Sequence, residues 1–296
     1  MINNIQKSIV QCYSRRHTAC IFAVIMFYVI LILGLFGAFL SSLYSFDNPE
    51  ETIWWHFLCV GVFLSNILLF KKKANTRHEK RQKLLSFLFI ISNTVRSIFP
   101  RIDVERICYF DNFLSTTIVG RSFATVGEIS LSFQIAFGLL FLMKQQDQSS
   151  LLPYILPPAI SCAQILCWFG VLTTNQFFHV CEESIWAVGF SLMIPLLIQL
   201  LRKTKETKRK QKLMGCVILA LIYVTYMFIV DIPMYYRRYS ENNVSQVRYL
   251  SLKEGIYDAM SCNLVTTKYK VWKEDSIWMI GYFVFGSLIS IGLINE

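Results

Sequence analysis

A pair of charged residues inside an apolar stretch is the feature of this sequence that could do chemistry. The segment 114–143 is long and apolar, yet it carries Arg121 and Glu128. With Thr125 and Ser132 they follow the spacing i, i+4, i+7 and i+11, which places all four on one helical face. A charge at the bilayer centre costs at least about 2.5–3.5 kcal/mol, so these groups must face protein, water or a partner. The sequence therefore predicts a polar intramembrane site on this helix.

The two charges are not expected to satisfy each other directly. Seven residues rise about 10 Å along a helix axis, which predicts that Arg121 and Glu128 each take a partner from another element. Small residues on the same helix, such as Gly120 and Gly127, would let a neighbouring helix approach closely. We therefore expect this helix to be central and to line a polar cavity, reached from the outer side, between the spans at 114–143, 181–201 and 213–236.

Further ionisable residues extend the candidate site toward the outer half of the membrane. They are Arg96, Glu182, Glu183 and Asp231. Each also has a structural interpretation: the two glutamates would stabilise a helix N-terminus, and Arg96 or Asp231 would extend its polar end to the membrane surface. With Arg121 and Glu128 they form the predicted substrate-binding or ion-path residues.

Recognised catalytic and cofactor motifs are absent from the sequence. Its four histidines form no HxxxH or HExxH, and its nine cysteines form no CxxC pair. GxSxG, Walker A and GxGxxG stretches are also missing. The sequence therefore predicts no metal centre and no cofactor, and it leaves the catalytic residues unknown. Three cysteines expected outside the membrane are Cys108, Cys181 and Cys262, two of which could form a disulfide in an oxidising compartment.

The elements that must position these groups are transmembrane helices. Of the 296 residues, 54% are hydrophobic and only 16% are charged, against about 25% in soluble domains. Several apolar runs reach about 20 residues, enough to cross a bilayer. We predict an all-α, polytopic transmembrane helical bundle that forms a single integral-membrane domain over residues 1–296. The predicted spans are 19–43, 53–70, 84–102, 114–143, 151–173, 181–201, 213–236 and 275–294.

Orientation depends on the segment 84–102, which begins apolar but carries Arg96. If it crosses, there are eight spans, both termini are cytoplasmic, and the basic runs 71–83 and 202–212 lie inside. If it is only interfacial, there are seven spans and 202–212 is forced outside. We favour eight spans, in a plasma or inner membrane. All six tryptophans then lie toward the outer face as an aromatic belt, and the basic runs meet anionic lipid headgroups, not nucleic acid.

Three functions fit this composition. The first is transport or binding of a small or lipid-like solute at the polar intramembrane site. The second is a membrane-embedded enzyme that acts on a lipid or lipid-linked substrate, with carboxylates for acid–base chemistry and an arginine for an anionic headgroup. The third is a non-catalytic accessory or assembly subunit, which requires no essential carboxylate. The sequence does not indicate a protein partner.

Overall fold

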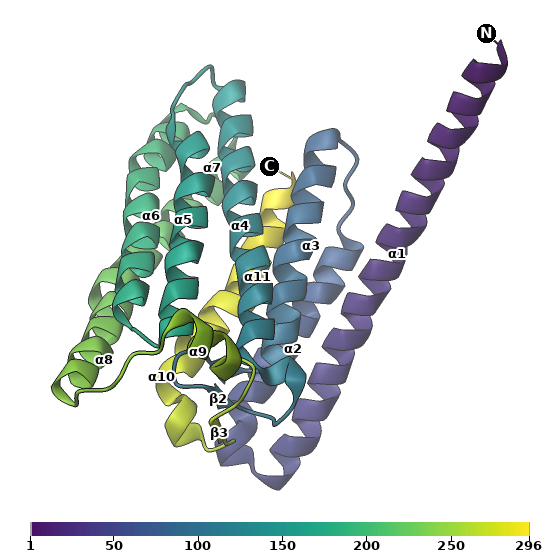
Figure 1. The fold of residues 1–296 in the computed structure, drawn as a ribbon. Coiled ribbons are helices and arrows are strands. Elements are labelled where there is room, and N and C mark those ends of the chain that lie inside the picture. Colours follow the sequence, from purple (N-terminus) through teal and green to yellow (C-terminus); the bar gives the residue numbers. More distant parts are fainter. Residues whose placement is uncertain (1, 296) are drawn as a thin grey trace.

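The computed structural model describes residues 2–295, with side chains from 25 to 294. The fold is an all-α bundle, 81% helical, as the sequence predicts (Figure 1). The first seven helices are α1 (Ile2–Asp47), α2 (Pro49–Lys71), α3 (Arg77–Ile98), α4 (Thr117–Gln145), α5 (Leu152–Thr173), α6 (Phe177–Lys203) and α7 (Thr207–Tyr226).

Two of the later helices contain a π-helical segment. The π-helix η2 (Met227–Asp231) joins α7 to α8 (Ile232–Val244) without a break, and η3 (Ile280–Phe285) joins α10 (Tyr269–Met279) to α11 (Gly286–Gly292). The remaining elements are the 3₁₀ turns η1 (Phe113–Ser115) and η4 (Leu293–Asn295), the short helix α9 (Leu252–Asp258), and the strands β1 (Arg101–Ile102), β2 (Ile107–Cys108) and β3 (Leu264–Val265).

Seven helices are long and apolar enough to cross a membrane, as expected of an integral membrane protein. Among the described helices, α3 is as long as several of these but more polar, and it packs against α2, α4 and α11. Its polar side chains bond to those neighbours: Ser92 Oγ donates to Phe123 O at 2.6 Å, and Asn93 Nδ2 donates to Ser287 Oγ at 3.0 Å. The helix ends at Ile98, earlier than the predicted 84–102 segment, because Pro100 follows and the chain then turns into β1.

The two basic segments lie at the same end of the bundle. At the start of α3, the His78 ring stacks on Phe141 near the end of α4, with 4.2 Å between ring centroids. Gln146 in the α4–α5 connection donates from Nε2 to Thr204 Oγ1 in the α6–α7 connection at 2.7 Å. These two connections therefore lie side by side. Both chain termini point toward this end (Figure 1). The segments 71–83 and 202–212 therefore share one side of the bundle.

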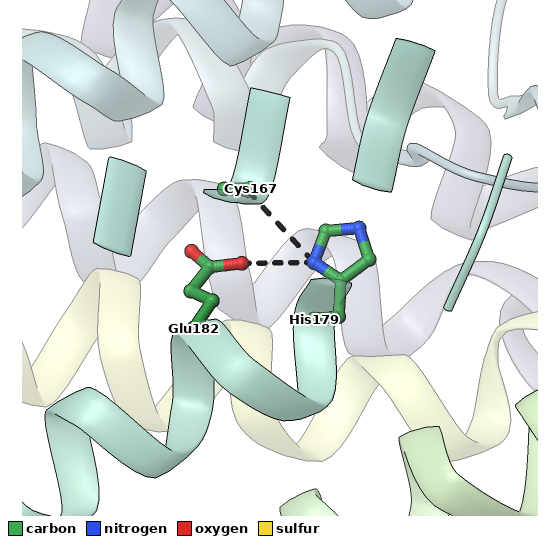
Figure 2. Close-up of side chains that lie close together, drawn as sticks. All are labelled: Cys167, His179 and Glu182. Carbon is green, nitrogen blue, oxygen red and sulfur yellow. Dashed lines mark hydrogen bonds and ion pairs between the residues drawn. The ribbon is translucent and has the colours of Figure 1, made fainter. Parts of the chain in front are cut away.

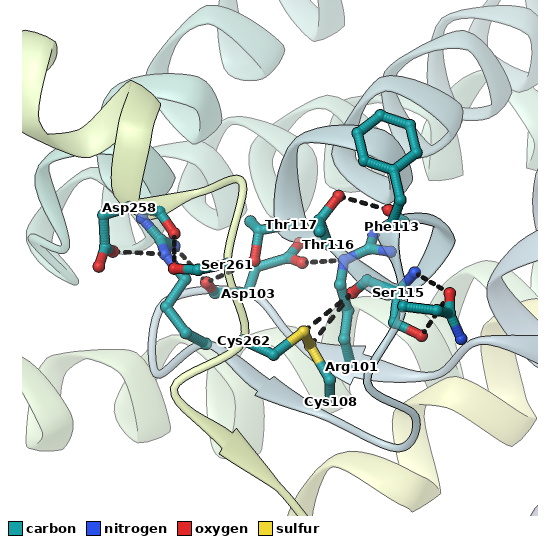
Figure 3. Close-up of a disulfide and its surroundings, with 12 residues drawn as sticks. Arg101, Asp103, Cys108, Phe113, Ser115, Thr116, Thr117, Asp258, Ser261 and Cys262 are labelled. Carbon is teal, nitrogen blue, oxygen red and sulfur yellow. Dashed lines mark hydrogen bonds and ion pairs between the residues drawn. A yellow bond between two sulfur atoms is a disulfide. The ribbon is translucent and has the colours of Figure 1, made fainter.

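The opposite end is closed by a small sheet and a disulfide. β2 pairs antiparallel with β1 and parallel with β3. A disulfide joins Cys108 to Cys262, and Cys181 is free, so two of the three cysteines expected outside are bonded (Figure 3). Beside it the buried guanidinium of Arg106 donates to Asp258 Oδ2 at 2.7 Å and to Val171 O at 2.9 Å. This end is therefore held together by a disulfide and by a buried ion pair.

Four of the six tryptophans expected in an aromatic belt are buried by protein, namely Trp54, Trp55, Trp186 and Trp272. Trp55 and Trp272 are fully buried, and Trp54 is 5% exposed. Trp54 stacks on Trp272 with 5.5 Å between ring centroids, and Trp55 lies 4.6 Å from the ring of Tyr109. The rings fill the interior between α2, α10 and the 98–117 segment, where they belong to one buried hydrophobic cluster.

Candidate functional site

The centre of the site is a direct ion pair between Arg121 and Glu128 on α4. Arg121 Nη2 donates to Glu128 Oε2 at 2.8 Å, and both residues are less than a tenth exposed. The prediction that the pair would not meet was therefore wrong. The axial rise is the distance between the two backbone positions only. The long arginine and glutamate side chains extend toward each other and span that distance. The pair forms along the helix, without an intervening group.

Partners from α5 and α3 complete this pair. Gln164 Oε1 accepts from Arg121 Nη2 at 2.8 Å, and Gln164 Nε2 donates to Glu128 Oε2 at 2.5 Å. Arg96 Nη1 approaches Glu128 Oε1 at 3.8 Å, and its guanidinium lies 4.6 Å above the Phe283 ring. A buried charge is tolerated when it is paired and hydrogen-bonded, which this arrangement achieves.

A second arginine–carboxylate pair lies at the start of α4. Arg101 Nε donates to Asp103 Oδ1 at 2.6 Å, and Asp103 Oδ2 lies 3.9 Å from Arg121 Nη1. Burial raises the pKa of Asp103, but the charges of Arg101, Arg121 and Arg96 outweigh it, so the net pKa is lowered. The Arg101 guanidinium occupies the space beside Gly120, where a Cβ atom would lie 1.2 Å from Nη1. Gly120 is therefore required for this contact.

The network reaches α6 through Glu182. Its Oε1 lies 4.0 Å from Arg121 Nη2, and its Oε2 lies 2.8 Å from His179 Nδ1. The Sγ atom of Cys167 on α5 lies 3.8 Å from the same ring nitrogen. Figure 2 shows the three side chains converging from α5 and α6. All three are buried, and their potential metal-ligand atoms lie within 4.8 Å of one another.

Glu183 on α6 and Asp231 on the α7–α8 helix lie beside the network, and Glu182 is an electrostatic neighbour of both. Asp231 is an electrostatic neighbour of Glu183, and the charged groups nearest Asp231 include Glu182, Asp275 and Arg238. Neither Glu183 nor Asp231 makes a salt bridge with any residue whose side chain the structure describes. Asp231 is the last residue of the π-helix η2, and π-helical turns are frequent at functional sites because they redirect side chains.

The six predicted residues thus fall into two adjoining groups. Arg96, Arg121, Glu128 and Glu182 belong to one contiguous network, and Glu183 and Asp231 lie beside it on α6 and η2. The network forms among α3, α4, α5 and α6, whereas the sequence indicated the fourth, sixth and seventh spans. That expectation omitted α5 and α3, the two helices that pack against α4.

Three residues of the network were not expected from the sequence. They are Gln164, Cys167 and His179. Gln164 carried a usable signal, because it is a lone amide within an apolar span. Cys167 and His179 lie in no recognised motif, and only the antiparallel packing of α5 and α6 brings them together. Metal-ligand residue types are therefore adjacent although the sequence predicts no metal centre.

Comparison with known proteins does not connect this arrangement to a described function. No protein-family model matches the chain, and neither a curated protein nor a solved structure is similar to it. Function must therefore be inferred from the site.

Proposed function

We propose that this membrane protein binds and transports a small solute that carries a positive charge. The observation behind the proposal is the pair Glu183 and Asp231, two carboxylates without a salt bridge among the described side chains. An ionisable group inside a membrane segment marks a substrate or ion path by default, because it is too costly to retain without use. A cationic group of a solute would supply the missing partner.

The neighbouring network leaves these two carboxylates available. Arg96, Arg101 and Arg121 face three carboxylates, Asp103, Glu128 and Glu182, so the network balances its own charges. None of the three arginines makes a salt bridge with Glu183 or Asp231 in the described part of the chain. The network would then hold α3, α4, α5 and α6 in place while the other two carboxylates bind the solute.

Tyrosines around the carboxylate pair support a cationic solute. Tyr223, Tyr226 and Tyr235 are each electrostatic neighbours of both Glu183 and Asp231. Aromatic faces attract cations, most strongly where water is excluded, and they recognise alkylated ammonium groups in particular. Carboxylates and aromatic rings together would favour an organic ammonium ion over an anion.

Binding and uptake of tetramethylammonium test the proposal. Full-length protein in nanodiscs should bind the ion, and proteoliposomes should take it up. A charge-assisted contact is worth about 1.5–3 kcal/mol, so Asp231→Asn should weaken binding about ten- to hundredfold. Glu241→Gln, an exposed carboxylate on α8, is the matched control and should bind as the wild type does. Equal affinity in Asp231→Asn and wild type would remove the basis of the proposal.

A membrane-embedded enzyme is the second candidate, favoured by Cys167, His179 and Glu182. A nucleophilic triad is not the arrangement they suggest. In a triad the nucleophile contacts one imidazole nitrogen and the acid contacts the other. Here thiol and carboxylate both lie against Nδ1, and Nε2 is buried without a hydrogen-bond partner among the described residues. Catalysis by these residues would therefore need a different chemistry, such as a bound metal ion.

A further inference from the structure

We infer that Cys167, His179 and Glu182 form a binding site for a divalent transition-metal ion of the zinc class. The inference concerns a different ligand from the solute proposed above, and of its three residues only Glu182 enters that proposal, as a counter-charge of the arginines. It starts from the geometry in Figure 2, where a thiol, an imidazole and a carboxylate converge on one small volume. These are the three side-chain types that bind zinc in proteins.

The distances suit a shared ion. Tetrahedral zinc places its ligands about 2.0–2.3 Å from the metal, so pairs of ligand atoms lie roughly 3–4 Å apart. The sulfur of Cys167 is 3.8 Å from His179 Nδ1, and Glu182 Oε2 is 2.8 Å from that nitrogen. Small side-chain adjustments would thus place all three atoms around one centre. Both Cys167 and Glu182 approach the same nitrogen, as ligands of one ion do and as members of a triad do not.

The helix packing explains how the ligands meet. His179 and Glu182 are three residues apart on α6, so they share a face of its first turns. Cys167 faces them from the last turns of α5, across the short connection between the two helices. Gly170 lets the imidazole lie against α5, because a Cβ atom there would lie 3.0 Å from the ring. The ring also stacks on Tyr235 with 5.1 Å between centroids, which limits its rotation.

Charge balance favours a divalent ion in this buried place. Binding would release the thiol proton to solvent, so the site would contain a thiolate, a carboxylate and a neutral imidazole. The thiolate and the carboxylate offset the 2+ charge of the ion, which lowers the cost of keeping it in a low-dielectric interior. With Glu182 bound to the ion, Asp103 and Glu128 remain as the counter-charges of the three arginines. Arg121 is already paired with Glu128 and lies 4.0 Å from the far carboxylate oxygen of Glu182, where it can orient that ligand.

Three protein ligands would leave one coordination position for water or a substrate atom. This open arrangement is typical of catalytic zinc sites, whereas structural sites use four protein ligands. The site would therefore supply the chemistry that the enzyme hypothesis lacks. It would also place a Lewis acid beside the arginines of the central network.

Metal content and a cobalt spectrum test the inference. Full-length protein purified from zinc-supplemented cells should contain about one zinc ion per chain, measured by mass spectrometry of the metal. Cys167→Ala and His179→Ala should lose that zinc, whereas Cys59→Ala should keep it, because Cys59 is a buried free cysteine on α2 that belongs to no candidate metal cluster. Metal-free wild type, or equal zinc in Cys167→Ala, would overturn the assignment.

Cobalt(II) provides a readout that does not require every variant to fold. Wild-type protein loaded with cobalt should show the thiolate charge-transfer absorption of a cysteine-bound ion and the visible bands of a tetrahedral site. Cys167→Ser should lose the charge-transfer absorption. A wild-type cobalt complex without that absorption would exclude Cys167 as a ligand and contradict the site, whatever the stability of the variants. Neither measurement uses an ammonium ion, so failure here leaves the proposed solute site to its own test.

Discussion

At the scale of single residues, Glu128 is the carboxylate at the centre of the buried network. It accepts from Arg121 and Gln164 and lies 3.8 Å from Arg96. Glu128→Gln keeps the shape but leaves two buried arginines without this counter-charge, so it should destabilise the protein by about 3–5 kcal/mol. The variant should also lose solute binding if the network positions the site. Thermal unfolding in detergent checks the first expectation and ammonium binding the second.

A double variant separates charge imbalance from lost packing. Arg121→Gln combined with Glu128→Gln removes both charges of the pair, so its destabilisation should be smaller than the sum of the two single effects. Additive effects would mean that the two side chains are not energetically coupled. Exposed Glu241→Gln should leave the unfolding temperature unchanged.

Asp103 should give the protein an acid-sensitive contact outside the spans. Its pKa is lowered in the folded state because three arginines outweigh its burial. A carboxylate with a lowered folded-state pKa stabilises the fold above its unfolded-state pKa of about 3.9, and this stabilisation disappears as pH falls through the folded-state value. Asp103→Asn should therefore unfold more easily at neutral pH and lose less stability on acidification. The measurement is the unfolding temperature at a series of decreasing pH values. An equal fall in unfolding temperature for the variant and the wild type would contradict this expectation. Exposed Asp47→Asn is the control.

The residue types and their helical spacing were enough to predict part of the site. The spacing of Arg121, Thr125 and Glu128 correctly placed them on one face, and the cost of burying charge correctly indicated that they need partners. The direct Arg121–Glu128 contact was missed because an axial rise measures backbone positions and ignores side-chain reach. The Cys167–His179 contact was missed because it depends on which helices pack together. Local sequence patterns do not predict helix packing.

At the scale of elements, glycine decides how closely α4 meets the 98–117 segment. A Cβ at Gly120 would overlap the Arg101 guanidinium, so Gly120→Ala should displace Arg101 from Asp103 and destabilise the fold by about 1–3 kcal/mol or more. Gly215→Ala on α7 is the matched control, because no atom lies within 4 Å of its Cβ position. The control should be neutral or stabilise by about 0.5–1 kcal/mol, since alanine is the better helix former. Equal unfolding temperatures for the two variants would contradict the proposed crowding.

The Cys108–Cys262 disulfide fixes the connection between β2 and the segment before β3. It links positions 154 residues apart, so its loss should lower stability by roughly 2–4 kcal/mol, the usual range for a native disulfide. Non-reducing peptide mass spectrometry should find Cys108 bonded to Cys262 and Cys181 as a free thiol. Three free thiols would contradict the pairing. The double variant Cys108→Ser with Cys262→Ser should unfold at lower temperature than wild type.

At the scale of the whole molecule, composition was enough for the fold class but not for the role of α3. The apolar runs predicted an all-α bundle, which the structure confirms. The polar residues of 84–102 left its place uncertain, because hydropathy assumes that a helix faces lipid. Ser92 and Asn93 instead bond to α4 and α11, so the polarity of α3 is satisfied by protein. Helix neighbours, not composition, decide whether such a segment belongs inside a bundle.

The arrangement of the two ends predicts the orientation of the chain. Short basic connections stay on the cytoplasmic side, and both basic segments lie at one end of the bundle, opposite the disulfide, which forms in oxidising compartments. In intact cells a membrane-impermeant thiol reagent should therefore label Gln246→Cys but not Lys73→Cys or Lys205→Cys, all three being exposed positions. The wild type, with its own cysteines, gives the background, and permeabilised cells should label all three sites. Labelling of either lysine position from outside would reverse the orientation and place the disulfide end in the cytoplasm.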